Sequence, residues 1–159
     1  MLKLLTFWLA EFKINHMKNY DLSEYILRDG DVIMFPLTQE EIGILASGRN
    51  EFEAYFKMPY VAGYHGKEVL SKIANQVNMD NDYWFMDSLW IVVDAKSKES
   101  YGTIRYQKDG EINKIIKNIT LFIDAVDTYN KAIELFAKFL SVNNYLNIIV
   151  EEDKECYEG

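Results

Sequence analysis

The chain has 159 residues, of which 49% are hydrophobic, 14% aromatic and 26% charged. This composition excludes an intrinsically disordered chain, because disorder needs low hydrophobicity and few aromatic residues. The length fits one domain with a sizeable core. The net charge of -8 argues against nucleic acid as a partner, because such binding relies on clustered Lys and Arg and no basic stripe occurs here.

The N-terminal 16 residues are expected to form an extension that precedes a single domain at residues 17–159. Their short apolar run cannot cross a bilayer, which needs about 20 residues, and it lacks the small residues of a signal-peptide cleavage site. Cys156 is the only cysteine, so no internal disulfide can form, which suits a reducing compartment. We therefore expect a cytoplasmic protein with no membrane partner.

The first half of the domain predicts one strand followed by helices. Residues 31–37, which are apolar after Asp31, predict a strand, and Thr38 with Glu41 forms a capping-box pattern that opens a short helix ending by Gly48. Residues 51–56 predict a further helical turn. Residues 67–77 predict a third helix, because their apolar positions recur at helical spacing.

The second half predicts a run of strands and one long helix. Strands are expected at 88–94, 101–107 and 112–123, with a turn at Asp109-Gly110 and a bulge around Lys117-Asn118. A helix capped by Asp127 or Thr128 follows, with apolar residues at helical spacing from Tyr129 to Leu140. Residues 145–150 predict a last strand, which makes a strand–helix–strand unit with parallel strands.

The usual catalytic motifs do not occur in the sequence. It contains no G-x-S-x-G, H-E-x-x-H or G-x-G-x-x-G motif and no phosphate loop of the G-x-x-x-x-G-K-S/T type. His16 and His65 are the only histidines, which excludes a histidine-rich metal site. The sequence motifs therefore give no support for a known type of catalytic site.

The order of elements resembles the GNAT-type (GCN5-related) N-acetyltransferases over residues 31–155. The residues that carry this resemblance are Phe35-Pro-Leu-Thr-Gln-Glu-Glu41, the aromatic strand at 83–94, Tyr101-Gly-Thr-Ile-Arg105 and Ile119-Thr-Leu-Phe-Ile-Asp124. The resemblance implies an α/β (α+β) fold: a mixed, mainly antiparallel sheet with a βαβ unit near the C-terminus and helices on both faces. It also implies acetyl-CoA as the cofactor of an active member.

In that family a Gln/Arg-x-x-Gly-x-Gly/Ala loop and the following helix N-terminus hold the cofactor pyrophosphate through backbone amides. The segment at that place has no glycine and no arginine, and its Asp124 and Asp127 bring negative charge. Two like charges within about 6 Å cost about 2–3 kcal/mol at an effective dielectric constant of about 20. The candidate cofactor-binding residues are Phe122, Ile123, Asp124, Ala125, Val126, Asp127, Thr128, Tyr129, Asn130 and Lys131.

Two further departures concern catalysis. Many family members carry a glutamate on the fourth strand as general base, and the alignment places Ile119 or Thr120 there, neither of which accepts a proton. The family also continues past its fifth strand with a helix and usually two more strands, whereas this sequence ends at Gly159. No catalytic residue is therefore assigned.

Three interpretations follow. The first is a GNAT-like domain with a degraded acetyl-CoA site and no or weak catalysis, with no cofactor and an unidentified protein partner. A second copy paired along an exposed strand edge at Tyr145–Val150 is one candidate partner. The second is an active N-acetyltransferase that uses acetyl-CoA and an unknown amine. The third is an unrelated α/β interaction module, which parallel strands that do not splay apart would favour.

Overall fold

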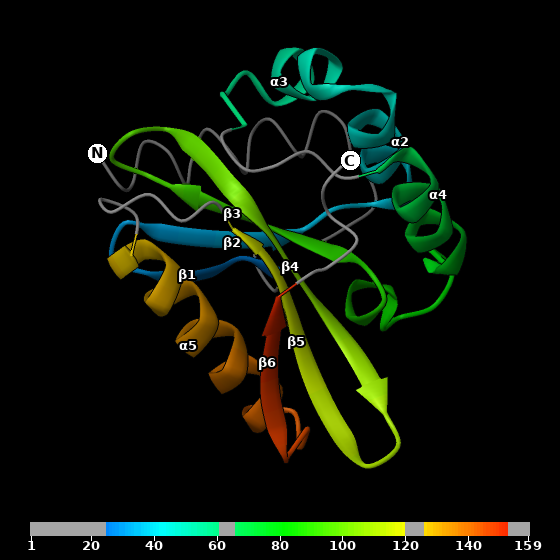
Figure 1. Cartoon of the computed structure of the whole chain (residues 1–159), viewed down its shortest axis with the longest axis vertical. Coiled ribbons are helices and arrows are strands. Elements are labelled where there is room, and N and C mark those ends of the chain that lie inside the picture. Colours follow the sequence, from blue (N-terminus) through cyan, green and yellow to red (C-terminus); the bar gives the residue numbers. More distant parts are fainter. Residues whose placement is uncertain (1–24, 61–65, 120–125, 153–159) are drawn as a thin grey trace.

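A computed structural model describes residues 25–60, 66–119 and 126–152. Its six strands form one sheet in the order of the chain, and every neighbouring pair is antiparallel except the last (Figure 1). The strands are β1 (Leu27–Asp29), β2 (Val32–Pro36), β3 (Leu89–Asp94), β4 (Glu99–Asp109), β5 (Ile112–Ile119) and β6 (Ile148–Glu152). The predicted fold class, a mixed and mainly antiparallel sheet, is confirmed.

Helices cover both faces of the sheet, as predicted (Figure 1). The helices α2 (Gln39–Ser47), α3 (Arg49–Phe56) and α4 (Lys67–Gln76) connect β2 to β3, and the short 3-10 helix η2 (Trp84–Met86) leads into β3. The long helix α5 (Val126–Val142) connects β5 to β6 on the opposite face. Since β5 and β6 pair in parallel, the predicted strand–helix–strand unit is confirmed.

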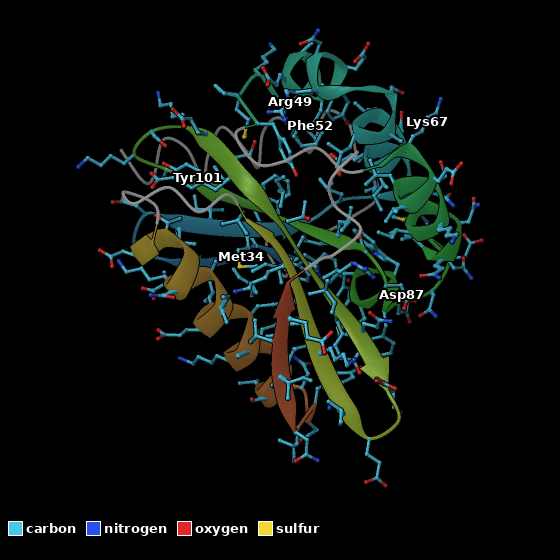
Figure 2. The ribbon with its side chains drawn as sticks, in the orientation of Figure 1. Met34, Arg49, Phe52, Lys67, Asp87 and Tyr101 are labelled. Atoms are coloured by element: carbon cyan, nitrogen blue, oxygen red, sulfur yellow. The ribbon has the colours of Figure 1, made fainter. Side chains whose placement is uncertain are left out.

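The alternation of side chains along the central strands divides the core into two layers. Ile91 and Val93 point toward α2, α3 and α4, whereas Trp90 and Val92 point toward α5. Figure 2 labels one member of each layer, Phe52 on the three-helix side and Met34 on the α5 side. Because both faces of β3 are covered, all its residues from Leu89 to Val93 are buried and apolar.

The predicted capping box is confirmed at the start of α2. The backbone N–H of Glu41 donates to the Thr38 hydroxyl at 3.2 Å, and the Glu41 carboxylate accepts from the N–H of Thr38 at 3.0 Å. Both residues are buried. Two of the otherwise unpaired N–H groups of this helix end are thereby satisfied inside the protein.

Two boundaries of the strand–helix–strand unit were predicted wrongly. The helix α5 begins at Val126, so Asp127 and Thr128 lie in its first turn instead of capping it. The strand β6 begins at Ile148 instead of residue 145, because Asn144 and Asn147 adopt left-handed conformations with φ of 67° and 56°. Such residues interrupt an extended segment.

The predicted bulge also lies elsewhere. The register between β4 and β5 is continuous from Gly102↔Ile119 to Asp109↔Ile112, so Lys117 and Asn118 are regularly paired. The irregularity occurs between β3 and β4, where Val92 faces Gly102, Val93 faces Ser100, and Tyr101 is the extra residue. The hairpin partner β1 was not predicted; it pairs with β2 across a tight turn at Gly30, whose φ is 60°.

Candidate functional site

The predicted cofactor segment lies at the N-terminal end of α5. Phe122, Ile123, Asp124 and Ala125 fall outside the described residues, and Val126 to Lys131 form the first turns of the helix. Backbone N–H groups at such a helix start have no intrahelical partner and favour negative charge. What surrounds this end therefore decides whether an anionic cofactor is accepted.

A hydrogen bond connects the first turn of α5 to the end of β3. The Thr128 hydroxyl donates to one carboxylate oxygen of Asp94 at 3.4 Å, and the other oxygen accepts from the N–H groups of Lys96 at 2.8 Å and Ser97 at 3.0 Å. Asp94 thus fixes the β3–β4 turn and contacts α5. The Thr128 side chain serves this tertiary contact, which explains why it does not cap its own helix.

Further carboxylates lie at this end of the molecule. The turn between β1 and β2 carries Asp29 and Asp31, both exposed, and the N–H of Ala95 donates to the backbone carbonyl of Asp31 at 2.7 Å. This hydrogen bond places the turn next to Asp94. With Asp127 exposed on α5, the start of the helix is flanked by acidic residues from three different connections.

Lys131 is the one predicted site residue with a positive charge. Its ammonium lies over the β1–β2 turn, 3.8 Å from where a Cβ atom at Gly30 would stand. The described residues contain no group of three His, Cys, Asp or Glu side chains placed to hold a metal ion. Lys96 and Lys98, both exposed in the β3–β4 turn beside Asp94, bring further positive charge, so carboxylates and ammonium groups are mixed at this end of the molecule.

The parallel strands stay paired along the whole of β6. The register runs from Asn113↔Ile148 to Lys117↔Glu152, and β5 continues for two residues, Asn118 and Ile119, that pair with β4 alone. Ile119, one of the two positions aligned with the general base, is therefore the last residue of β5. The other, Thr120, lies outside the described residues.

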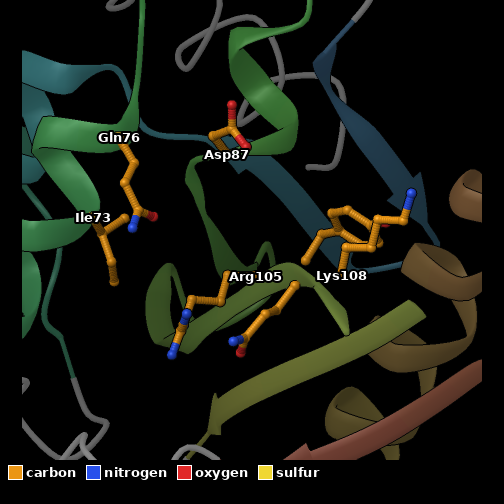
Figure 3. A pocket seen from close by; sticks show the side chains of 7 residues that line it. Ile73, Gln76, Asp87, Arg105 and Lys108 are labelled. Atoms are coloured by element: carbon orange, nitrogen blue, oxygen red, sulfur yellow. The ribbon is translucent and has the colours of Figure 1, made fainter. Parts of the chain in front are cut away.

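A cavity of about 280 Å³ lies between α4 and the free edge of β4 (Figure 3). It exists because β4 pairs with β3 only as far as Arg105 but with β5 as far as Asp109, so its end projects beyond β3. Figure 3 shows charges of both signs around it, on Asp87, Arg105 and Lys108. It is lined by Ile73, Gln76, Asp87, Arg105, Tyr106, Gln107 and Lys108.

A second cavity of about 370 Å³ lies between the β4–β5 hairpin and the loop before β6. In its wall the Tyr106 hydroxyl donates to the buried Asn113, whose amide donates to the Leu146 carbonyl. Burial raises the pKa of the Tyr106 phenol, and the nearby Tyr145 and Asp87 raise it further. Both cavities join residues distant in sequence, and no motif in the sequence indicated either.

Comparisons with protein-family models, with curated proteins and with solved structures find no match to this chain. The resemblance to N-acetyltransferases therefore depends on the sequence pattern alone. Among the described residues no helix is long and apolar enough to span a membrane.

Proposed function

We propose that this chain is an acetyltransferase-fold protein with a degraded acetyl-CoA site and no or weak catalysis, which acts in the cytoplasm through contacts with protein. The observation that carries the proposal is the pair of carboxylates, Asp127 and Asp94, at the α5 N-terminus. Asp127 lies in its first turn, and Thr128 connects it to the carboxylate of Asp94. A cofactor pyrophosphate at this position meets negative charge at close range.

The order of the elements supports the family part of this proposal. Three helices separate β2 from β3, and α5 joins the only parallel pair of strands in the described sheet. That order agrees with what the resemblance implies. Fold and function are separable, however, because function depends on the residues of the site.

An active N-acetyltransferase that uses acetyl-CoA is the second candidate. It is favoured by the length of α5, a 17-residue helix, because the first N–H groups of a helix lack intrahelical partners and can donate whatever their side chains are. Lys131 supplies one positive charge near this end. In this candidate the acidic neighbours lower the affinity for the cofactor without abolishing it.

An interaction module unrelated to acetyltransferases is the third candidate. It is favoured by the pairing of β5 with β6, which holds from Ile148 to Glu152 without the strands parting. The first and third candidates share the expectation of a protein partner and of no nucleic-acid ligand, given the net charge of -8. They differ in whether the chain is related to the acetyltransferases, and in both the chain has no cofactor.

Calorimetric titration of the purified full chain with acetyl-CoA and with CoA tests the proposal. We expect no heat of binding and no shift in melting temperature at millimolar cofactor, because the carboxylates near the helix start oppose the pyrophosphate. Binding with a dissociation constant in the micromolar range contradicts the proposal and establishes the second candidate. An Asp127→Asn variant tests the cause, since it removes one charge, keeps the side-chain shape and should bind the cofactor better than the wild type.

A further inference from the structure

Most of the large apolar side chains that are exposed among the described residues lie in or near α5, β5 and β6. Among the large hydrophobic side chains that the structure shows exposed, all except Tyr83 lie at the start of β5, the end of α5, the loop after α5 or along β6. They are Ile112, Val142, Leu146, Ile149 and Val150. Val142, the last residue of α5, is 73% exposed, and Leu146 in the loop before β6 is 62% exposed. Ile149 and Val150 point to opposite faces of β6, so the feature they share is the edge of this strand.

The backbone of β6 offers a second kind of contact. β6 is the last strand of the sheet and pairs with β5 on one side; no described strand lies on its other side. Outer N–H and C=O groups of an edge strand can pair with another extended strand. An exposed edge that also carries Ile149 and Val150, each 41% exposed, provides both hydrogen bonds and apolar area.

We propose that the outer edge of β6 pairs in antiparallel orientation with β6 of a second copy of this chain, with Val150 on the two-fold axis. The proposal depends on the proposed function only in treating β6 as a protein-interaction surface. In this register Val150 faces Val150 of the second copy, Ile149 faces Glu151, and Ile148 faces Glu152. The strand starts at Ile148, after the left-handed Asn147, so this register pairs all five of its residues.

The distribution of charge along β6 favours this occupant and this direction. The strand is apolar at its start and acidic at its end, so parallel pairing would set Glu151 and Glu152 against their own copies. Antiparallel pairing sets each acid against an isoleucine. Glu151 is also held at 3.3 Å from the Lys114 ammonium, which offsets its charge. A closed two-fold dimer uses the β6 edge once in each copy and covers that edge in both.

Sedimentation or light scattering of the full chain over a concentration series tests the pairing, at physiological ionic strength so that charge repulsion is screened beyond about 8 Å. We expect twice the chain mass at high concentration. Val150→Lys should raise the dissociation constant about tenfold or more, because two ammonium groups then face each other across the axis. Tyr83→Lys is the matched control, since it also replaces an exposed apolar side chain, away from β6, and should leave the dimer intact.

Disulfide cross-linking tests the register, in a Cys156→Ser background. Directly opposed residues of antiparallel strands have Cα atoms about 4.5–5.5 Å apart, within the roughly 4.4–6.8 Å that a disulfide spans. Val150→Cys should therefore form covalent dimers on mild oxidation, whereas Ile149→Cys and Tyr83→Cys should not. A strict monomer at about 1 mM, a dimer that Val150→Lys leaves unchanged, or cross-linking through Ile149→Cys alone overturns the proposal. None of these results alters the cofactor titration.

Discussion

The strands β3 and β6 have similar apolar residues and opposite surroundings. In β3, Ile91, Val92 and Val93 are completely buried between a strand on each side and helices on each face. In β6, Ile149 and Val150 are each 41% exposed, and one side of the strand has no described neighbour. The same residue types therefore stabilise the fold in one strand and are available for contact in the other.

The comparison shows that composition predicts a strand but does not predict its position in a sheet. A central strand and an edge strand both favour β-branched residues. Their difference comes from the elements that cover them, and only the central strand is covered on every side. Substitutions that are equal in chemistry should consequently have unequal effects in β3 and β6.

The largest effect is expected from Trp90→Ala in β3. Trp90 is completely buried, packs against Phe136 and Phe139 with ring centroids 5.4 Å and 5.2 Å away, and donates to the Phe85 carbonyl at 2.9 Å. Its removal should lower the free energy of unfolding by about 3–5 kcal/mol. Urea unfolding followed by far-UV circular dichroism measures this loss. A decrease below about 1 kcal/mol would mean that α5 does not pack on β3 as described.

A matched pair of substitutions compares the strands directly. Val93→Ala should lower the free energy of unfolding by about 2 kcal/mol, because two methyl groups leave a closed core. Val150→Ala should change it by less than about 0.5 kcal/mol when the protein is dilute enough to be monomeric. Urea unfolding of both variants under one set of conditions gives the comparison. Equal losses would contradict the assignment of β6 as an exposed edge.

A smaller effect is expected from Asp127→Asn at the start of α5. The carboxylate interacts favourably with the N-terminal end of the helix. Its neutralisation should therefore cost about 0.5 kcal/mol of unfolding free energy, while any weak affinity for CoA should rise. We expect the stability to fall and the affinity for CoA to rise. Thermal unfolding measures the first change and calorimetry measures the second. A loss of both would mean that Asp127 does not oppose the cofactor.

The smallest effect concerns the partly exposed Tyr106 near the second cavity. Its pKa is raised in the folded state, first by burial and then by Tyr145 and Asp87, so the folded protein binds the phenolic proton more tightly than the unfolded chain. This contribution is complete below the ordinary tyrosine pKa of 10.0 and is lost as the pH rises through the raised value. Raising the pH from about 8 to about 11 should therefore lower the free energy of unfolding less in Tyr106→Phe than in the wild type. Urea midpoints that fall equally in the variant and the wild type over this pH range would contradict the raised pKa of Tyr106.

The local features of the fold were predictable because their causes are local. The Thr38–Glu41 capping box needs residues three apart, and the helical spacing of Ala132, Phe136 and Leu140 marks the buried face of α5. The predicted bulge failed for a physical reason. Ile115 and Ile116 break the alternation because both faces of β5 are covered there, and their exposed fractions are 0% and 5%.

The surroundings of the candidate site were less predictable. The sequence indicated Asp127 and Lys131, but Asp31 and Asp94 come to the same end of the molecule through hairpins far away in sequence. The cavity beside Arg105 likewise arises from the unequal lengths of β3 and β4. Such features depend on register and on tertiary contacts, for which a single sequence carries no local signal. The family resemblance and the lost cofactor site stay predictions.

Amide hydrogen exchange, recorded with and without acetyl-CoA at low and high protein concentration, tests the central claim most directly. We expect β3 amides to exchange only through global unfolding, and β6 amides to exchange rapidly in dilute protein and to become protected in concentrated protein. Acetyl-CoA should leave the first turn of α5 unchanged in both conditions. Two results together would contradict the proposal of a lost cofactor site and a protein partner. They are protection of that turn by acetyl-CoA and exchange rates of the β6 amides that do not change with protein concentration.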